Sequence, residues 1–238
     1  AFFESMIRTN VSTTNISYIL EDRDTIRHLF RVVCGLDSLI VGEDQIQHQV
    51  RECYMKAKND GHVNGMLSRL FDKAMAVGKR VRTETALNKG AVSVGSAAVE
   101  LAESTIGTLE GKGVTILGAG DIASVIAKNL VGKNLGAVVV SNRTYSRAIE
   151  LADELGGKAV SMARITDAVD DSDVVLVATG APHAVLKECH VSEAMARRPD
   201  RPLMIIDVSI PRNTEDSVKD IPNVRVENMD SLETIAMR

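Results

Sequence analysis

The sequence predicts an α/β protein in which a mostly helical part precedes a doubly wound parallel sheet. Three observations carry this prediction. Apolar residues recur at helical spacing up to about Ala102. From Gly113 onward, short β-rich runs alternate with helical stretches, which is the pattern of βαβ units. A glycine-rich turn separates the first of these runs from the helix that follows it.

Four helices are expected in the N-terminal part. The first begins near Asp22 and ends at Gly35, and a loop over 36–42 follows it. The next two span 43–59 and 66–83, and Ser93 caps a fourth. The residues expected to face inward on the first three are Ile26, Leu29, Phe30, Val33, Ile46, Val50, Cys53, Leu67, Leu70, Phe71, Ala74, Val77 and Val81.

Six β-rich runs follow, as in a doubly wound dinucleotide-binding fold. They cover 114–117, 137–141, 158–161, 174–179, 203–209 and 224–227. Helical stretches include 121–135 and 146–155, and the last ten residues, 229–238, resemble the start of a further helix.

Composition is close to the globular average, with 45% hydrophobic and 25% charged residues. It excludes a disordered chain, a collagen-like repeat and a coiled coil. No apolar run approaches the roughly 18 residues of a membrane span, so we expect a soluble protein. The net charge of −4 argues against a positive electrostatic field over the whole molecule that would attract nucleic acid. The 3% aromatic content argues against aromatic side chains that stack on single-stranded bases. Three cysteines are too few for a disulfide scaffold, which favours reduced thiols and a cytoplasmic setting.

The glycine turn has the pattern of a pyrophosphate-binding loop. The first glycine permits a tight turn, the second lets a phosphate approach the backbone, and a small third residue lets helix and strand pack closely. The alternative is a purely structural turn. The loop consists of Gly118, Ala119, Gly120, Asp121, Ile122 and Ala123.

The end of the second predicted strand favours NADP(H) over NAD. An NAD site usually carries an acid there, whereas this chain has Asn142, Arg143 and Thr144. A guanidinium would pair with a 2′-phosphate that a carboxylate would repel. The alternative for Arg143 is a solvated residue at a helix start. The turns 179–182 and 207–212 either border the nicotinamide or are ordinary turns.

A polar constellation lies in the helical part. His28 and Arg31 share one helix, and Ser38 lies in the following loop. Glu43, Gln45 and Gln49 open the next helix, where an ammonium, a carboxylate or an amide of an amino acid could be bound. A solvated helix face is the alternative interpretation.

The run H-L-F-R-V-x-x-G-L-D-S-L-I-V-G-E-D-Q-I-x-x-Q-V, from His28 to Val50, resembles the glutamyl-tRNA reductase family. The run from Ala91 to Ala102 and the loop and turn described above agree with it, so the similarity extends from about Asp22 to the end of the chain. The resemblance implies NADPH-dependent reduction of glutamyl-tRNA(Glu) to glutamate 1-semialdehyde, the first step of porphyrin and other tetrapyrrole synthesis. It implies a catalytic role for His28 and substrate-binding roles for Ser38, Glu43, Asp44, Gln45 and Gln49.

The same resemblance implies a domain division. Residues 1–90 would belong to the catalytic, glutamyl-tRNA-binding domain, and 91–228 would form the NADPH-binding Rossmann domain. Residues 229–238 would start a linker or dimerisation helix. A homodimer and handover of the product to the semialdehyde aminomutase are the implied partnerships.

This chain departs from the family at the nucleophile. The family places a cysteine in a T-C-N-R type motif upstream of the histidine, and no such motif occurs here. We expect Cys34 and Cys53 to be core thiols and assign Cys189 to the other domain. The chain is therefore expected to be a folded, NADPH-binding fragment without reductase activity. The alternatives are a non-catalytic NADP- or partner-binding module and a shikimate-dehydrogenase-like oxidoreductase.

Metal ions and nucleic acid are two further classes of ligand. The five histidines show no metal-ligand spacing, so no metal is expected. Between Arg51 and Lys89 there are nine Lys or Arg against four acids, a difference of +5. Lys79, Arg80 and Arg82 could contact tRNA phosphates there, and a solvated helix face is the alternative.

Overall fold

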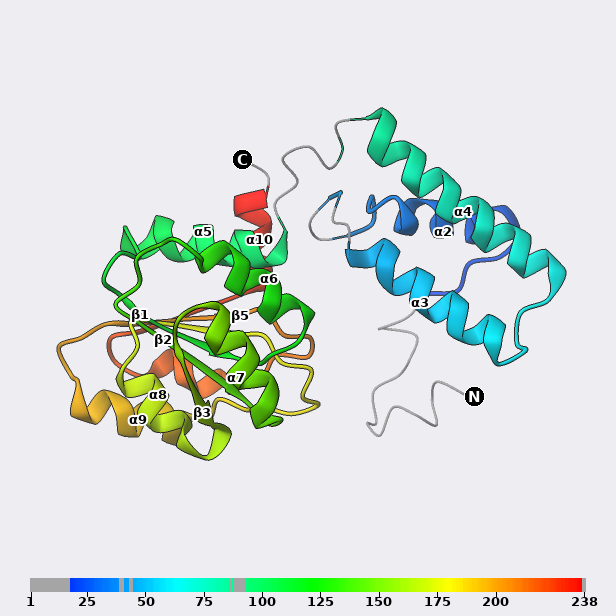
Figure 1. Ribbon diagram of the computed structural model, residues 1–238. Helices are drawn as coiled ribbons and strands as arrows, with labels where there is room; N and C mark the ends of the chain where they lie inside the picture. The colour runs from blue at the N-terminus through cyan, green and yellow to red at the C-terminus, as the bar shows by residue number, and fades with distance from the viewer. Residues whose placement is uncertain (1–17, 39–40, 43–44, 86, 88–92, 237–238) are drawn as a thin grey trace. The chain divides into compact units, whose positions relative to one another are not determined.

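The computed structural model of the chain describes residues 18–38, 41–42, 45–85, 87 and 93–236 (Figure 1). The chain divides into two compact units, Ala1–Gly90 and Ala91–Arg238. We call the first the helical unit and the second the sheet unit. Among the described residues, no helix is both long enough and apolar enough to cross a membrane.

The helical unit contains three helices that contact one another: α2 (Asp22–Val33), α3 (Gln45–Asn59) and α4 (Gly65–Glu84). The side chain of Asn64 caps α4 by accepting a hydrogen bond from the backbone N–H of Leu67 at 2.9 Å. The helices lie within two residues of their expected bounds, except that the expected start of the second, at Glu43 and Asp44, lies outside the described residues.

The buried core of the helical unit is small. Its fully buried side chains include Val33 and Ala74, each 0% exposed, and Tyr54 at 5%. Three residues expected to face inward, Ile26, Cys53 and Leu67, are exposed instead. The expectation was wrong because the apolar stripes of these helices are wider than the contact that the three described helices make with one another.

The sheet unit is built on six parallel strands in the order β3-β2-β1-β4-β5-β6. This is the strand order of a doubly wound Rossmann fold, so the predicted fold class is confirmed. The strands are β1 (Gly113–Leu117), β2 (Ala137–Asn142), β3 (Lys158–Ser161), β4 (Val174–Val177), β5 (Leu203–Asp207) and β6 (Val224–Asn228).

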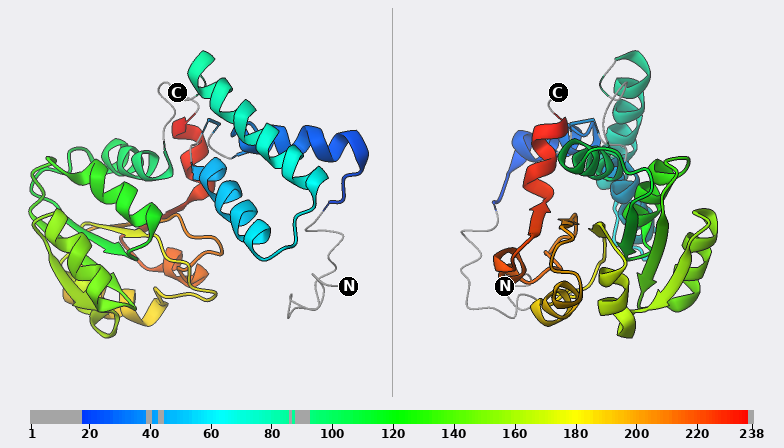
Figure 2. Two further views of the ribbon diagram at one scale, coloured as in Figure 1. Left: turned by 45° about the vertical axis from the view of Figure 1, so that its right-hand side comes forward. Right: turned by 90° about the vertical axis from the view of Figure 1, so that its left-hand side faces the viewer.

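Helices cover both faces of this sheet, with α5 and α6 on one face and α8 and α9 on the other (Figures 1 and 2). β1, β4 and β5 are consequently buried along their whole length, which explains their continuous apolar sequences. The helices are α5 (Val94–Ile106), α6 (Asp121–Leu130), α7 (Tyr145–Glu154), α8 (Ile165–Asp170), α9 (Glu188–Arg197) and α10 (Met229–Ala236).

One local detail differs from the sequence expectation. α6 ends at Leu130 rather than 135, because Gly132 and Asn134 adopt left-handed backbone conformations that end the helix. The final helix, α10, packs against α5 and β6 within the sheet unit. Short 3₁₀ turns at Met162–Arg164 and Asp216–Asp220 complete the described elements.

Candidate functional site

The glycine loop of the sheet unit joins β1 to α6 at the point where the strand order reverses. Gly118 has φ +123°, and its N–H donates to the Ser141 carbonyl at 2.7 Å. A Cβ at Gly118 would collide with the carbonyl oxygen of Ala178, which follows β4. Only glycine therefore fits where the ends of β1 and β4 meet, the place at which ligands bind in open α/β sheets.

Gly120 and the first turn of α6 form an open, candidate anion-binding site. A Cβ on Gly120 would meet no protein atom within 4 Å, so the space above this backbone is free for a ligand. The N–H groups of Asp121, Ile122 and Ala123 lie in the first helical turn and find no acceptor among the described residues. Ala123 is 0% exposed, which lets α6 pack closely on the sheet. Ala119, between the two glycines, is half-buried.

The end of β2 presents a cation and no carboxylate. Asn142 is half-buried, and its amide Nδ2 donates to the Thr144 carbonyl at 3.1 Å, which shapes the turn. Arg143 is exposed and has no ion-pair or hydrogen-bond partner among the described residues. Thr144 is the exposed N-cap residue of α7 and makes no side-chain capping bond there. Binding of a 2′-phosphate by the residues at this turn stays a prediction.

A buried hydrogen-bond network ties together the loops that follow β4 and β5. One carboxylate oxygen of Asp207 accepts from the Ser209 N–H at 2.9 Å. The other oxygen accepts from the N–H groups of Asn213 and Thr214, both at 2.7 Å. The amide of Asn213 donates to the carbonyl of Ala181 at 2.9 Å, so both loops share one scaffold.

Asn213 was not singled out from the sequence. It is 0% exposed, and its amide oxygen also accepts a hydrogen bond from the Thr179 hydroxyl. The only local signal is an amide residue directly after the turn that closes β5. This network fixes the turns 179–182 and 207–212 relative to each other, and they lie at the carboxyl ends of β4 and β5.

In the helical unit, His28 is held by groups on both sides of its ring. Its Nδ1 lies 3.0 Å from a carboxylate oxygen of Asp37, and its Nε2 lies 2.8 Å from the Tyr18 hydroxyl. Arg31 forms an ion pair with the other carboxylate oxygen of Asp37, with its Nε 2.8 Å and its Nη2 2.6 Å from that oxygen. Asp37 therefore orients the imidazole and favours a proton on Nδ1, which leaves Nε2 to accept a hydrogen bond from the Tyr18 hydroxyl.

Asp37 is a candidate site residue that the sequence interpretation missed, although it lies within the run from His28 to Val50. The hydrogen bond from Arg31 holds the pKa of this carboxyl below its usual range, and the same pair raises the pKa of Arg31. The side chains of His28 and Asp37 are 33% and 22% exposed, so a substrate could reach them.

The predicted substrate-binding residues are only partly described. Ser38 follows Asp37 and is half-buried; Gln45 opens α3 and is half-buried, whereas Gln49 is exposed. No hydrogen bond joins either glutamine to His28 in the part of the chain that the structure describes. Glu43 and Asp44 lie outside the described residues. The joint role of all five predicted residues in binding an amino acid remains a prediction.

Within the helical unit, the described hydrogen bonds of His28 go to Tyr18 and Asp37 and to neither cysteine. Cys34 is 5% exposed, and burial raises the pKa of its thiol against the opposing effect of Arg82. Cys34 is a core thiol as expected, but Cys53 and Cys189 are exposed. The described residues also contain no cluster of His, Cys, Asp or Glu that could hold a metal ion.

Comparison with known proteins identifies both units. Residues 2–85 match the family model of the glutamyl-tRNAGlu reductase N-terminal domain. The chain is 45% identical over 221 residues to glutamyl-tRNA reductase of Methanopyrus kandleri and 43% identical over 230 residues to that of Archaeoglobus fulgidus. The chain belongs to the glutamyl-tRNA reductase family. The solved structure of the Methanopyrus kandleri glutamyl-tRNA reductase matches 92% of it with a TM-score of 0.58.

The sheet unit also belongs to a wider group of dehydrogenase domains, since residues 100–235 match the model for shikimate / quinate 5-dehydrogenase. The glutamyl-tRNA reductase match therefore depends on the helical unit as well as on the sheet. The chain spans about half the length of these relatives: 55% of the Methanopyrus kandleri protein and 52% of the Archaeoglobus fulgidus protein.

Proposed function

We propose that this chain supplies the NADPH-binding unit and part of the substrate-binding unit of a glutamyl-tRNA reductase. The reaction would reduce the glutamyl ester of tRNA(Glu) to glutamate 1-semialdehyde, which opens tetrapyrrole synthesis. The observation that carries the proposal is the Tyr18–His28–Asp37–Arg31 array inside a chain that also holds an open dinucleotide loop. A homodimer and handover of the semialdehyde to the aminomutase remain part of this proposal.

The residues of the sheet unit fit NADPH. The free N–H groups at the start of α6 and the open space over Gly120 suit a pyrophosphate. Arg143 suits a 2′-phosphate because no described carboxylate neutralises it. The network of Asp207 and Asn213 would hold rigid the turns that border the nicotinamide. When bound, NADPH supplies the hydride.

In the helical unit, His28 would act on the ester. With Asp37 bound to Nδ1, a protonated Nε2 can donate a proton to the departing ribose oxygen of the tRNA, and a neutral Nε2 can orient the ester. Tyr18 occupies Nε2 in this structure, so a substrate would have to displace its hydroxyl.

An ester accepts hydride poorly, which is why the family's chemistry passes through a thioester. A thiolate attacks the glutamyl carbonyl, the tRNA hydroxyl leaves, and hydride addition to the thioester releases the aldehyde and the thiolate. Because this sequence lacks the T-C-N-R type cysteine motif and Cys34 is buried, we expect a polypeptide of these residues to bind NADPH and to form no semialdehyde. The same cysteine placement favours one alternative function, a non-catalytic NADP-binding module.

The test is turnover of glutamyl-tRNA by the full-length gene product with NADPH, followed as semialdehyde. His28→Asn is expected to lower kcat by about two to four orders of magnitude, the range of general acid–base catalysis. His62→Asn, at an exposed histidine between α3 and α4, is the matched control and should leave kcat unchanged. Semialdehyde formation by His28→Asn at the wild-type rate would overturn the assignment. An inactive full-length product that still binds NADPH would favour the binding module.

A further inference from the structure

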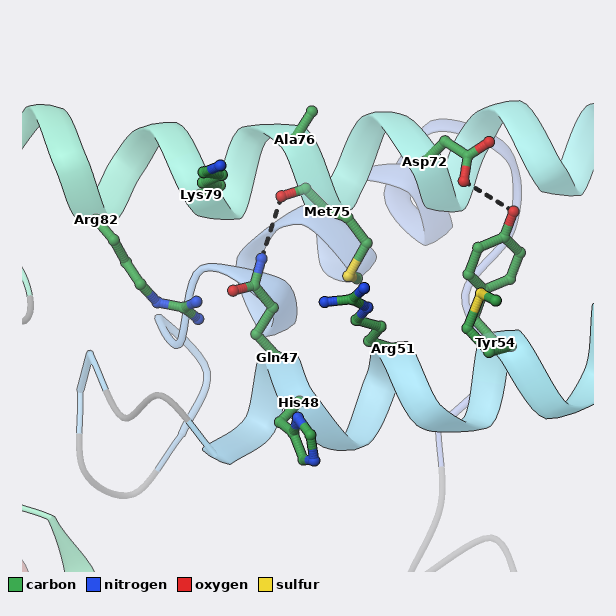
Figure 3. A pocket seen from close by; sticks show the side chains of 10 residues that line it. Gln47, His48, Arg51, Tyr54, Asp72, Met75, Ala76, Lys79 and Arg82 are labelled. Atoms are coloured by element: carbon green, nitrogen blue, oxygen red, sulfur yellow. Dashed lines mark hydrogen bonds between the residues drawn. The ribbon is translucent and has the colours of Figure 1, made fainter.

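A groove of about 560 Å³ runs between α3 and α4 of the helical unit (Figure 3). Its walls are held in place by contacts between the two helices. The amide of Gln47 donates to the Met75 carbonyl at 3.1 Å, and the hydroxyl of Tyr54 donates to Asp72 at 2.8 Å. The groove is therefore part of the folded unit.

Cations line both walls of this groove. Arg51 projects from α3, and Lys79 and Arg82 project from α4. Arg51 and Lys79 are exposed, and no carboxylate of the described residues lies within ion-pair distance of either. Arg82 is tied to the structure, with its Nη2 3.5 Å from the Val33 carbonyl.

Two other charged side chains nearby are already paired. Arg80 forms an ion pair with Glu84 at 3.1 Å, and His48 lies 3.3 Å from Glu52. Arg80 is therefore paired with a carboxylate of its own helix, unlike Arg51 and Lys79. The carboxylate of Asp72 also lines the groove; it accepts a hydrogen bond from Tyr54 and forms no ion pair with Arg51 or Lys79.

The groove is on a different side of α3 from the predicted substrate amides. Residues of an α-helix advance by about 100° each, so Gln45 and Gln49 lie roughly opposite Gln47 around the axis. Gln47 and Arg51 share the groove side. The two cations are thus separate from the residues proposed to bind the glutamyl group.

We propose that this groove binds the phosphodiester backbone of RNA, with Arg51 and Lys79 as the phosphate ligands. Under the proposed function, on which this inference rests, that RNA is the body of the tRNA substrate. The chain as a whole carries −4, but residues 51–89 carry +5, so a polyanion is attracted to the segment that carries Arg51 and Lys79. Tyr54 is 5% exposed and stacks on Phe71, which leaves its ring unavailable to bases and favours a backbone contact.

The experiment measures binding of uncharged tRNA(Glu) to the full-length protein by fluorescence anisotropy over a series of salt concentrations. The variant Arg51→Gln/Lys79→Gln should bind about tenfold more weakly at low salt, and its salt slope should fall by about 1.5, as expected for two lost phosphate contacts. The control Lys56→Gln/Lys73→Gln removes the same charge from the same two helices at exposed positions outside the groove. It should change affinity by less than about twofold.

A gain-of-function variant tests the same site in the other direction. Ala76 is exposed and lines the groove, so Ala76→Lys should tighten tRNA binding by about threefold at low salt. NADPH titration and thermal melting of each variant report whether folding is preserved.

Equal weakening in the groove and control pairs, or no weakening in either, would overturn the inference. So would absence of tRNA binding to the unaltered protein. These outcomes differ from failure of the proposed function, which is read from semialdehyde formation. A reductase whose KM for glutamyl-tRNA is unchanged in the groove variant would keep the function and reject the groove.

Discussion

The two units of this chain build their sites by different means. In the sheet unit, the candidate cofactor site consists mainly of backbone: the turn at Gly118, the open Gly120 and the free N–H groups of α6. In the helical unit, the candidate site consists of side chains from separate segments, with Asp37 joining His28 to Arg31. A backbone site is specified by a short local sequence, whereas a side-chain site exists only once the segments meet.

The units also differ in how they are stabilised. Ile205, in the centre of β5, is 0% exposed and is covered by helices on both faces of the sheet. In the helical unit, Ile26 is 45% and Met66 is 80% exposed. The sheet unit therefore carries most of the hydrophobic stabilisation within its own elements, and the predictions below address that contrast.

The largest expected effect is on stability. Ile205→Ala should lower the free energy of unfolding of the sheet unit by about 2–5 kcal/mol, because it leaves a cavity in a filled core. Ile26→Ala, at the exposed position of α2, should cost less than about 1 kcal/mol. Urea denaturation followed by circular dichroism measures both. Equal losses would show that the helical unit has a core comparable with that of the sheet.

The next effect concerns the cofactor loop. Gly120→Val places a branched side chain where the pyrophosphate must approach the backbone, and charge-assisted bonds of about 1.5–3 kcal/mol each would be lost. NADPH affinity measured by calorimetry should fall by about two orders of magnitude while the melting temperature is kept. Gly118→Ala is the contrasting variant and should destabilise the fold, since its Cβ meets Ala178. Unchanged NADPH affinity in folded Gly120→Val would remove the loop from the site.

A smaller effect is expected for the choice between cofactors. Arg143→Ala should weaken NADPH binding by about 1–3 kcal/mol, the scale of one hydrogen bond to a charged group, and leave NADH binding unaltered. Parallel titrations with the two cofactors provide the measurement. The assignment of the 2′-phosphate to Arg143 fails if both affinities fall together.

The smallest effect is the pH dependence of the helical unit. The pKa of Asp37 is lowered in the folded state, so its ion pair stabilises this unit above the ordinary pKa of the carboxyl, near 4, and is lost as pH falls below it. The melting temperature of the wild type should therefore decline in that acidic range, and Asp37→Asn should flatten the decline. An identical decline in Asp37→Asn would assign the pH dependence to other carboxyls.

Much of the fold could be predicted from the sequence because local rules govern it. Ser93 caps α5 as expected, with its hydroxyl accepting from the Ser96 N–H at 3.1 Å. The start of each predicted strand lies within one residue of the observed one. Two strands end earlier than expected, at Val177 and Asp207, where the chain enters the loops that Ser209 and Asn213 join by hydrogen bonds.

The sequence by itself determined the two-part organisation of helices and sheet, the dinucleotide loop and the absence of an acid after β2. Each of these depends on periodicity or on backbone freedom within a few consecutive residues. Only the tertiary structure decided that Asp37 orients His28, that Asn213 joins two loops, that Cys53 is exposed, and that Arg51 and Lys79 share a groove. Those features depend on which faces of separate segments contact each other, and these contacts are decided by side-chain packing between the segments.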